Sequence, residues 1–264
     1  MTEVPQPEDI YRRTKEEGER RLERPILEMV STGLAAGFDI VAGVVALGIV
    51  DASLKARYGP GLAHVFASLA FGIGFVFLVV GRGELFTENF LVPIAGLDHR
   101  RRSSWLNLAK LWTTSPVANV LGGLVMILIL TTHGVLPPGT SAALAGNAAS
   151  IHAHGTLTLF ASAVFAGALI TAMTWFVEGQ ESMLVRVAVA WIAGALLALG
   201  SFDHVIVVTL ELIFGYRFGA QFQWTFIVVN FFLAAGGNML GGIGLVTLNR
   251  LTQGKQGERK RASA

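Results

Sequence analysis

The sequence predicts an all-α integral membrane protein with six transmembrane helices in two inverted three-helix repeats, of which the second and fifth helices are broken. Three observations lead to this fold class: scarce charge, six long apolar segments and an internal repeat. Only 14% of the 264 residues are charged and 53% are hydrophobic, whereas soluble chains average about 25% charged residues. This composition excludes a disordered chain, a nucleic-acid-binding domain and a disulfide-stapled secreted module. The absence of cysteine excludes thiol catalysis and thiolate metal sites.

Six apolar segments are candidate membrane spans. They cover residues 26–50, 61–96, 106–132, 156–177, 183–215 and 224–248. About 20 helical residues cross the hydrocarbon core of a bilayer, and four of the segments fit that length. The second and fifth would be about 54 Å and about 50 Å long as single helices, so each must be broken, bent or partly outside the bilayer.

The flanking segments differ from the spans because they are polar. We expect a cytoplasmic N-terminal helix in residues 1–25, a six-span channel domain in 26–250 and a mobile, basic cytoplasmic tail in 251–264. Fifteen lysines and arginines lie in residues 1–25 and 250–264 and in the gaps 98–104 and 178–186, against three in the opposite loops. Since basic residues are enriched in cytoplasmic loops, both termini are predicted to be cytoplasmic, in a multi-pass protein of a bacterial inner membrane.

An internal repeat relates the two halves at an offset of 119 residues. Ala-Asn-Val-Leu-Gly-Gly at 118–123 matches Gly-Asn-Met-Leu-Gly-Gly at 237–242, and at the same offset Gly81 meets Gly200 and Leu85 meets His204. The two over-long segments are therefore equivalent. With three spans in each half, the halves are inverted relative to each other.

The breaks are placed at residues 81–89 and 200–204. Gly81, Gly83 and Gly200 are expected to permit unusual backbone angles there. Paired discontinuous helices in an inverted repeat point to a transport site near the bilayer midplane. The alternative is two tilted helices with re-entrant ends and no transport role.

Four motifs in order resemble those of the formate/nitrite transporter family, closest to its YfdC-like branch, and the resemblance covers about residues 26–250. They are Gly-Glu-Leu-Phe-Thr at 83–87, Ser-Phe-Asp-His at 201–204, Trp112 with Asn119 and Gly122 in the third span, and the Gly-Asn-Met-Leu-Gly-Gly stretch of the sixth. The resemblance implies an aquaporin-like protomer in a symmetric homopentamer embedded in lipid. It also implies a pore in each protomer that passes small monovalent anions such as formate or nitrite, or their neutral acids. No cofactor, metal or nucleic acid is expected.

The same resemblance assigns pore residues by position. It implies that His204 is the central histidine and Thr87 the threonine of the first broken loop, and that the pore narrows at Leu85, Phe86 and Leu197. A histidine suits this place because its ordinary pKa near 6.5 lets it share or relay a proton. The alternative for His204 is a structural hydrogen bond that closes the loop.

The chain departs from the family pattern in its fourth span. The lysine of the outer vestibule falls at Gly155, so it is absent, although His152 and His154 lie beside it. The family's asparagine further along that helix falls at Thr171. These departures leave anion selectivity more open than the fold.

Further polar residues are expected to support the loops. Asn119 and Asn238, in equivalent helices, are expected to hydrogen-bond the broken loops and hold their shape. Arg82 and Glu84 are expected to form an ion pair, or Glu84 to cap the half-helix that follows. Glu88 either caps that half-helix or faces the pore, which would favour a neutral or cationic solute. Asp39, within the first span, is either hydrogen-bonded between helices or pore-lining.

Two other functions compete with that of an anion channel, namely an enzyme and a channel for neutral solutes. An enzyme is disfavoured because the sequence has no nucleophile elbow, no zinc-protease motif and no Gly-rich phosphate loop. A channel for small neutral solutes is the stronger rival, because the loops are acidic and the vestibule lysine is missing.

Overall fold

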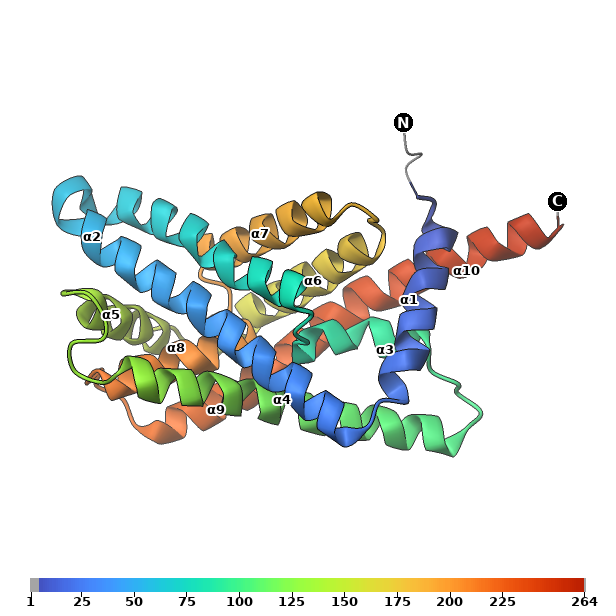
Figure 1. Cartoon of the computed structure of the whole chain (residues 1–264), viewed down its shortest axis with the longest axis horizontal. Coiled ribbons are helices and arrows are strands. Elements are labelled where there is room, and N and C mark those ends of the chain that lie inside the picture. The colour runs from blue at the N-terminus through green and yellow to red at the C-terminus, as the bar shows by residue number, and fades with distance from the viewer. Residues whose placement is uncertain (1–4, 264) are drawn as a thin grey trace.

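The computed structural model describes residues 5–263, and every regular element in that part of the chain is helical (Figure 1). Residues 1–4 of the expected N-terminal segment and residue 264 of the expected tail lie outside the described residues. The elements are α1 (Pro7–Leu22), α2 (Ile26–Gly81), η1 (Phe86–Phe90), α3 (Val92–Ala95), α4 (Arg102–Leu130), α5 (Thr140–His152), α6 (Thr156–Glu178), α7 (Met183–Leu199), α8 (Val205–Arg217), α9 (Trp224–Met239), η2 (Leu240–Thr247) and α10 (Leu248–Ser263).

The first two predicted spans form one element, α2, which folds back on itself at Gly59. Gly59 has φ +79°, a left-handed angle that favours glycine, and Pro60 starts the returning arm because proline fits the first turn of a helix. Figure 1 shows the two arms running antiparallel, with their turn at the end of the molecule opposite the chain termini. We call these two ends the distal end and the terminal end.

The six predicted crossings are present. In the described residues, α2, α4, α6 and the continuous rod Trp224–Arg261 are long and apolar enough to span a membrane, and α7 is a shorter apolar helix. The second arm of α2 ends at Gly81 and is followed by η1 and α3, and α7 ends at Leu199 and is followed by α8. The second and fifth spans are therefore broken, as predicted.

The backbone reverses at equivalent residues in the two breaks, and neither is a glycine. Arg82 has φ 55° and Ser201 has φ 49°, whereas Gly81, Gly83 and Gly200 are not among the positive-φ residues. The prediction that these glycines supply the unusual angles was wrong. At Gly200 a Cβ would instead overlap the ring of Phe202, so the glycine is needed for space.

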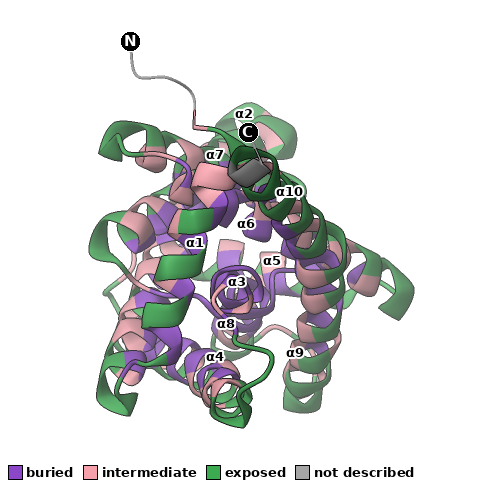
Figure 2. Cartoon of the chain, turned by 90° about the vertical axis from the view of Figure 1, so that its right-hand side faces the viewer, coloured by how far each residue is buried: buried purple, intermediate pink, exposed green. Residues whose placement is uncertain are grey.

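The half-helices that follow the breaks lie in the middle of the molecule. Figure 2 shows α3 and α8 coloured as buried and surrounded by the other helices. Small residues bring the surrounding helices close: a Cβ at Gly37 would overlap the carbonyl oxygen of Asn119, and one at Gly167 that of Asn238.

A short helix precedes each half of the repeat. Helix α1 precedes α2 and packs on α3, and α5 precedes α6 and packs on α8. The sequence predicted α1 but not α5, because α5 is too short and too rich in alanine to stand out as a span. The two helices lie at opposite ends of the molecule (Figure 1).

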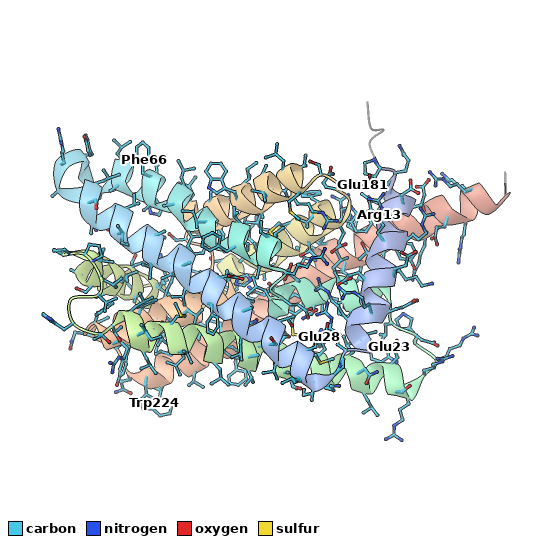
Figure 3. The ribbon with its side chains drawn as sticks, viewed as in Figure 1. Arg13, Glu23, Glu28, Phe66, Glu181 and Trp224 are labelled. Carbon is cyan, nitrogen blue, oxygen red and sulfur yellow. The ribbon has the colours of Figure 1, made fainter. Side chains whose placement is uncertain are left out.

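The C-terminal segment is a helix, α10, rather than the mobile tail that its polar sequence suggested. It packs along α1, where a Cβ at Gly254 would overlap the side chain of Tyr11 and Arg261 binds Asp9 with a 3.0 Å ion pair. Figure 3 shows a further contact at this end, where Arg13 of α1 lies beside Glu181, which follows α6.

Candidate functional site

The two broken loops meet at one hydrogen bond in the middle of the fold. Thr87 Oγ1 and His204 Nε2 are 2.7 Å apart, and both residues are fully buried. Thr87 belongs to η1 and His204 precedes α8 directly. The contact therefore joins the two halves of the repeat, 117 residues apart in sequence.

The position of His204 at the start of α8 determines which ring nitrogen donates. Its Nδ1 accepts the backbone N–H of Val207 at 3.4 Å and so caps the helix. In the neutral ring an accepting Nδ1 leaves the proton on Nε2. Nε2 therefore donates to the hydroxyl oxygen of Thr87.

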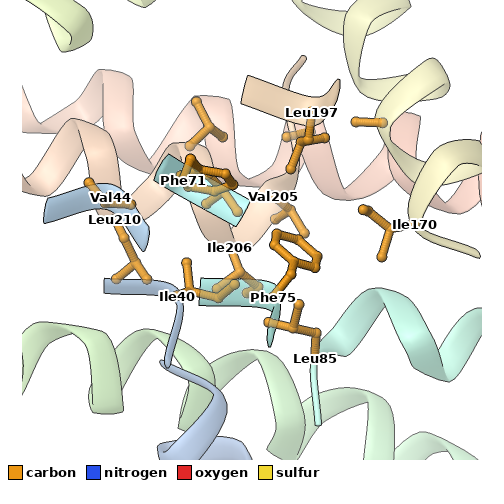
Figure 4. Close-up of a cluster of buried hydrophobic side chains, with 14 of the residues drawn as sticks. Ile40, Val44, Phe71, Phe75, Leu85, Ile170, Leu197, Val205, Ile206 and Leu210 are labelled. Atoms are coloured by element: carbon orange, nitrogen blue, oxygen red, sulfur yellow. The ribbon is translucent and has the colours of Figure 1, made fainter. Parts of the chain in front are cut away.

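Buried apolar side chains from several helices form one cluster in the middle of the fold, among them Phe75, Leu85, Leu197 and Val205 (Figure 4). The ring of Phe75 meets the His204 ring edge-on, with centroids 6.4 Å apart. The three residues expected to narrow the pore, Leu85, Phe86 and Leu197, all lie buried in this hydrophobic cluster. A charged solute entering the cluster would lose its hydration without gaining a counter-charge.

The first loop is held by Asn119 of α4. Its Oδ1 accepts the backbone N–H of Phe86 at 3.0 Å, and its Nδ2 donates to the carbonyl oxygens of Glu84 at 2.9 Å and Gly33 at 3.0 Å. All three partners are backbone groups that a helix break exposes or that lie on the adjacent arm.

The second loop is held in the same way by Asn238 of α9. Its Oδ1 accepts the N–H of Val205 at 2.9 Å, and its Nδ2 donates to the carbonyl oxygens of Asp203 at 2.9 Å and Ala163 at 2.8 Å. The two asparagines therefore make matching bonds to matching loop positions.

The carboxylate of Glu84 binds arginines from outside its loop. Arg24, in the link between α1 and α2, lies 2.5 Å from Glu84 Oε2, and Arg21 of α1 lies 3.5 Å from it. Asn89 donates to the other oxygen at 2.8 Å. The expected pair between Glu84 and Arg82 does not form, because the left-handed turn at Arg82 leaves that side chain exposed while Glu84 is buried.

Two other predicted residues lie near this loop. Glu88 is buried, and its Oε2 accepts the backbone N–H of Leu85 at 2.8 Å, which is the contact of a helix-capping residue. Thr171 of α6 is fully buried with its hydroxyl unpartnered among the described residues, and a Cβ at Gly242 would overlap that hydroxyl.

A cavity of about 340 Å³ opens at the distal end, and we call it the distal cavity. Two carboxylates without a predicted role line this cavity. They are Asp203, next to His204, and Glu211, about two helical turns away on α8. Asp203 is 3% exposed, and its Oδ2 has no partner among the described residues. Glu211 Oε1 accepts Nδ2 of Asn147 from α5 at 3.0 Å.

Some of these residues were detectable from sequence and some were not. Glu211 is an ionisable residue inside a predicted span, which by itself marks a pathway. Phe71 lines the distal cavity and Phe75 packs on His204. Nothing in the uniformly apolar second span distinguishes these inward-facing positions from lipid-facing ones.

The two histidines beside the position of the missing vestibule lysine, His152 and His154, lie in different environments. His152 packs edge-on against Phe226, with ring centroids 4.4 Å apart, and has an aromatic environment. His154 is exposed and lines a second cavity of about 640 Å³ that shares Asp203 with the first.

Asp39, in the first arm of α2, lies beside the first break, where a Cβ at Gly83 would be 3.0 Å from its Oδ2.

Comparison with known proteins agrees with the fold. The model of a family described as formate/nitrite transporter matches residues 8–251. The chain is 25% identical over 237 residues to the inner membrane protein YfdC of Escherichia coli, covering 88% of this chain and 74% of that protein. Among solved structures it is similar to a pentameric formate channel with formate bound, at a TM-score of 0.72 and 20% identity over 84% of this chain and 95% of that one. It is also similar to an FNT family ion channel, at a TM-score of 0.75 and 18% identity over 91% and 97%.

Proposed function

Because the chain belongs to the formate/nitrite transporter family, we propose that it is a channel for small monovalent weak acids of the formate and nitrite class, with His204 at the midpoint of the pore. The path runs from the distal cavity through the apolar cluster to the terminal end. The observation that carries the proposal is the 2.7 Å contact between Thr87 and His204. In this contact the imidazole ring of His204, at the start of α8, meets the hydroxyl of Thr87 in η1, so the two helix breaks adjoin at an ionisable group.

The chemistry of this contact suits a weak acid better than a free anion. An apolar constriction opposes a bare charge, and an imidazole exchanges protons readily near neutral pH. A proton shared at or near His204 would let the solute cross the cluster as its neutral acid. Thr87 orients the ring for that exchange by accepting from Nε2.

The other residues take supporting roles in the proposal. Leu85, Phe86 and Leu197 narrow the pore, and Thr171 lies beside it as a buried hydroxyl. Asn119 and Asn238 hold the loops, Glu84 anchors the first loop to Arg24, and Glu88 caps η1. No role is assigned to Arg82.

We further propose that the chain forms a homopentamer in a cell membrane, with both termini in the cytoplasm. The pentameric formate channel of similar fold supports the assembly. The bias of lysine and arginine toward the terminal end supports the orientation. Large apolar side chains such as Leu157, Leu184 and Phe232 are strongly exposed on the single chain, and lipid or neighbouring protomers would cover them.

A channel for neutral solutes is the second candidate. The distal cavity favours it, because the carboxylates of Asp203 and Glu211 would repel an incoming anion. This candidate predicts passage of glycerol-sized neutral molecules without dependence on pH.

Uptake into proteoliposomes separates the two candidates. Wild-type protein is expected to pass formate faster at pH 6 than at pH 8, and to pass glycerol slowly at both. In His204→Asn the formate flux is expected to fall at least about tenfold, because the proton-exchanging ring is lost. His99→Asn, in an exposed loop, is the matched control and should behave as wild type. Glycerol flux that exceeds formate flux, or an unchanged His204→Asn, would reject the weak-acid channel.

A further inference from the structure

The distal cavity contains two carboxylates that lack a cationic partner, and this is unexpected in a path for anions. We propose that the distal cavity is a binding site for a small monovalent cation that donates hydrogen bonds, of the ammonium class, held between Asp203 and Glu211. The site goes beyond the proposed function, because it binds its cation whichever solute crosses the pore.

Asp203 supplies the first acceptor. Its backbone is fixed on both sides, since its carbonyl accepts from Asn238 Nδ2 at 2.9 Å and its N–H donates to Ser162 Oγ at 3.0 Å. The side chain is 3% exposed, lines the cavity, and leaves Oδ2 without a partner in the described part of the chain. A buried carboxylate oxygen with no donor is costly, so the site demands a ligand that donates.

Glu211 supplies the second acceptor from the wall of the same cavity. Among the described residues its one hydrogen-bond donor is Asn147 Nδ2, at 3.0 Å from Oε1. Asp203 and Glu211 line the same cavity. Two ionised carboxylates in one cavity repel each other, and one shared positive charge stabilises both.

The other charged groups around the cavity are already engaged. Lys55 lies 3.4 Å from Asp51, so these two cavity residues neutralise each other. His64 bonds through Nε2 to the carbonyl oxygen of Leu199 at 2.9 Å. His154 lines the neighbouring cavity but is exposed to solvent. No ion pair to Asp203 or Glu211 forms within residues 5–263.

The lining selects the class of cation. Among the described residues no group of three or more His, Cys, Asp or Glu side chains could hold a metal ion. Calcium in particular takes six to eight oxygen ligands, and magnesium keeps several waters. Phe71 and Phe202 also line the cavity, and aromatic faces attract organic and ammonium cations. An ammonium group offers the N–H donors that both carboxylates require. A cation bound here would also neutralise the cavity toward an incoming anion.

The test is calorimetric titration of methylammonium chloride into the purified full-length protein, without any transport. Saturable binding is expected, and Asp203→Asn and Glu211→Gln should each weaken it at least about tenfold, because each removes one charge-assisted acceptor. The matched control is the double variant Asp51→Asn with Lys55→Gln, which removes the neutral pair from the same cavity and should bind as wild type.

Three results would overturn the site. They are no saturable binding to the wild type, unchanged affinity in both carboxylate variants, or equal affinity for potassium, which has no hydrogen to donate. Size-exclusion profiles establish that each variant is assembled, and if Asp203→Asn is not, Glu211→Gln decides alone. Formate uptake measured on the same preparations is a separate readout, so failure of the weak-acid channel and failure of the cation site are distinguishable.

Discussion

The two broken loops have similar backbone conformations, but only one of them has its buried carboxylate neutralised by arginine. Arg82 and Ser201 both reverse the chain with positive φ, 119 residues apart, and an asparagine holds each loop through three matching hydrogen bonds. Each loop also presents a carboxylate at the equivalent position, Glu84 and Asp203. Glu84 is paired with Arg24 and Arg21, whereas Asp203 Oδ2 has no partner among the described residues.

The difference arises in the short helix that precedes each half. Helix α1 has a basic end, and Arg21 together with Arg24 just beyond it reaches Glu84. Helix α5, Thr140–His152, contains no lysine or arginine and reaches the second half-helix with Asn147. The repeat thus specifies the loops, and what packs on them determines whether their charge is neutralised.

The largest expected effect is loss of the buried pair at the terminal end. Arg24→Ala leaves Glu84 buried with less positive charge, and removing one partner of a buried pair costs about 3 kcal/mol or more of unfolding free energy. The measurement is denaturant unfolding in detergent, followed by the fluorescence of the five tryptophans. Arg82→Ala, exposed in the same loop, is the control and should change the free energy by less than about 0.5 kcal/mol. Equal losses of unfolding free energy in the two variants would show that the ion pair between Arg24 and Glu84 does not stabilise the fold.

The second effect tests the likeness of the loops rather than their difference. Asn119→Ala and Asn238→Ala each remove three buried hydrogen bonds and leave backbone groups unpaired, at about 2 kcal/mol or more. The two losses should agree within about 1 kcal/mol if the loops are equivalent. Thermal unfolding of both variants beside the wild type measures this, and a large loss at one asparagine alone would contradict the equivalence.

The third expected effect is a gain in the free energy of unfolding, whereas the first is a loss. Asp203→Asn removes a buried carboxylate whose Oδ2 has no partner among the described residues, so in sodium phosphate buffer without ammonium salts it should raise the free energy of unfolding by about 1 kcal/mol. Glu84→Gln under the same conditions should lower it, because its arginines lose their counter-charge. Shifts of the same sign in the two variants would remove the electrostatic contrast between the loops.

The smallest effect concerns the docking of α1 at the terminal end. The hydrogen bond and charge of Arg261 lower the pKa of Asp9 below its ordinary 3.8. Burial raises the pKa of Glu17, but Arg21 and Arg20 outweigh burial and leave it below its ordinary 4.5. Since both pKa values are lowered on folding, their stabilisation is complete above about pH 5 and is lost as the pH falls through the lowered values.

Hydrogen exchange of the α1 backbone amides measures this loss. Protection should hold from pH 7 to pH 5 and weaken below about pH 4, and in Asp9→Asn part of that change should disappear. Protection that instead declines between pH 7 and pH 5 would point to groups other than these two carboxylates. No counterpart of this acid-sensitive docking is expected at α5, which has no carboxylate.

Much of the fold followed from local properties of the chain. Hydropathy and length identified the spans. The excess length of the second and fifth, together with the internal repeat, indicated their breaks, because a single helix of that length is much longer than the hydrocarbon core is thick. Two errors came from judging residues singly. Gly81 and Gly83 were expected to supply the unusual angles that Arg82 supplies, and the polar tail 251–264 was expected to be mobile although it packs on α1.

The sequence by itself determined the spans, the repeat, the two breaks and the positions of Thr87 and His204 within them, because these depend on local hydropathy and on motifs a few residues long. Only the tertiary structure decided that these two side chains touch, that Glu84 binds Arg24 rather than Arg82, and that Asp203 faces a cavity with Glu211. The physical reason is distance along the chain. Glu84 and Arg24 are 60 residues apart and Thr87 and His204 are 117 apart, and a partner so remote is selected by how the helices pack.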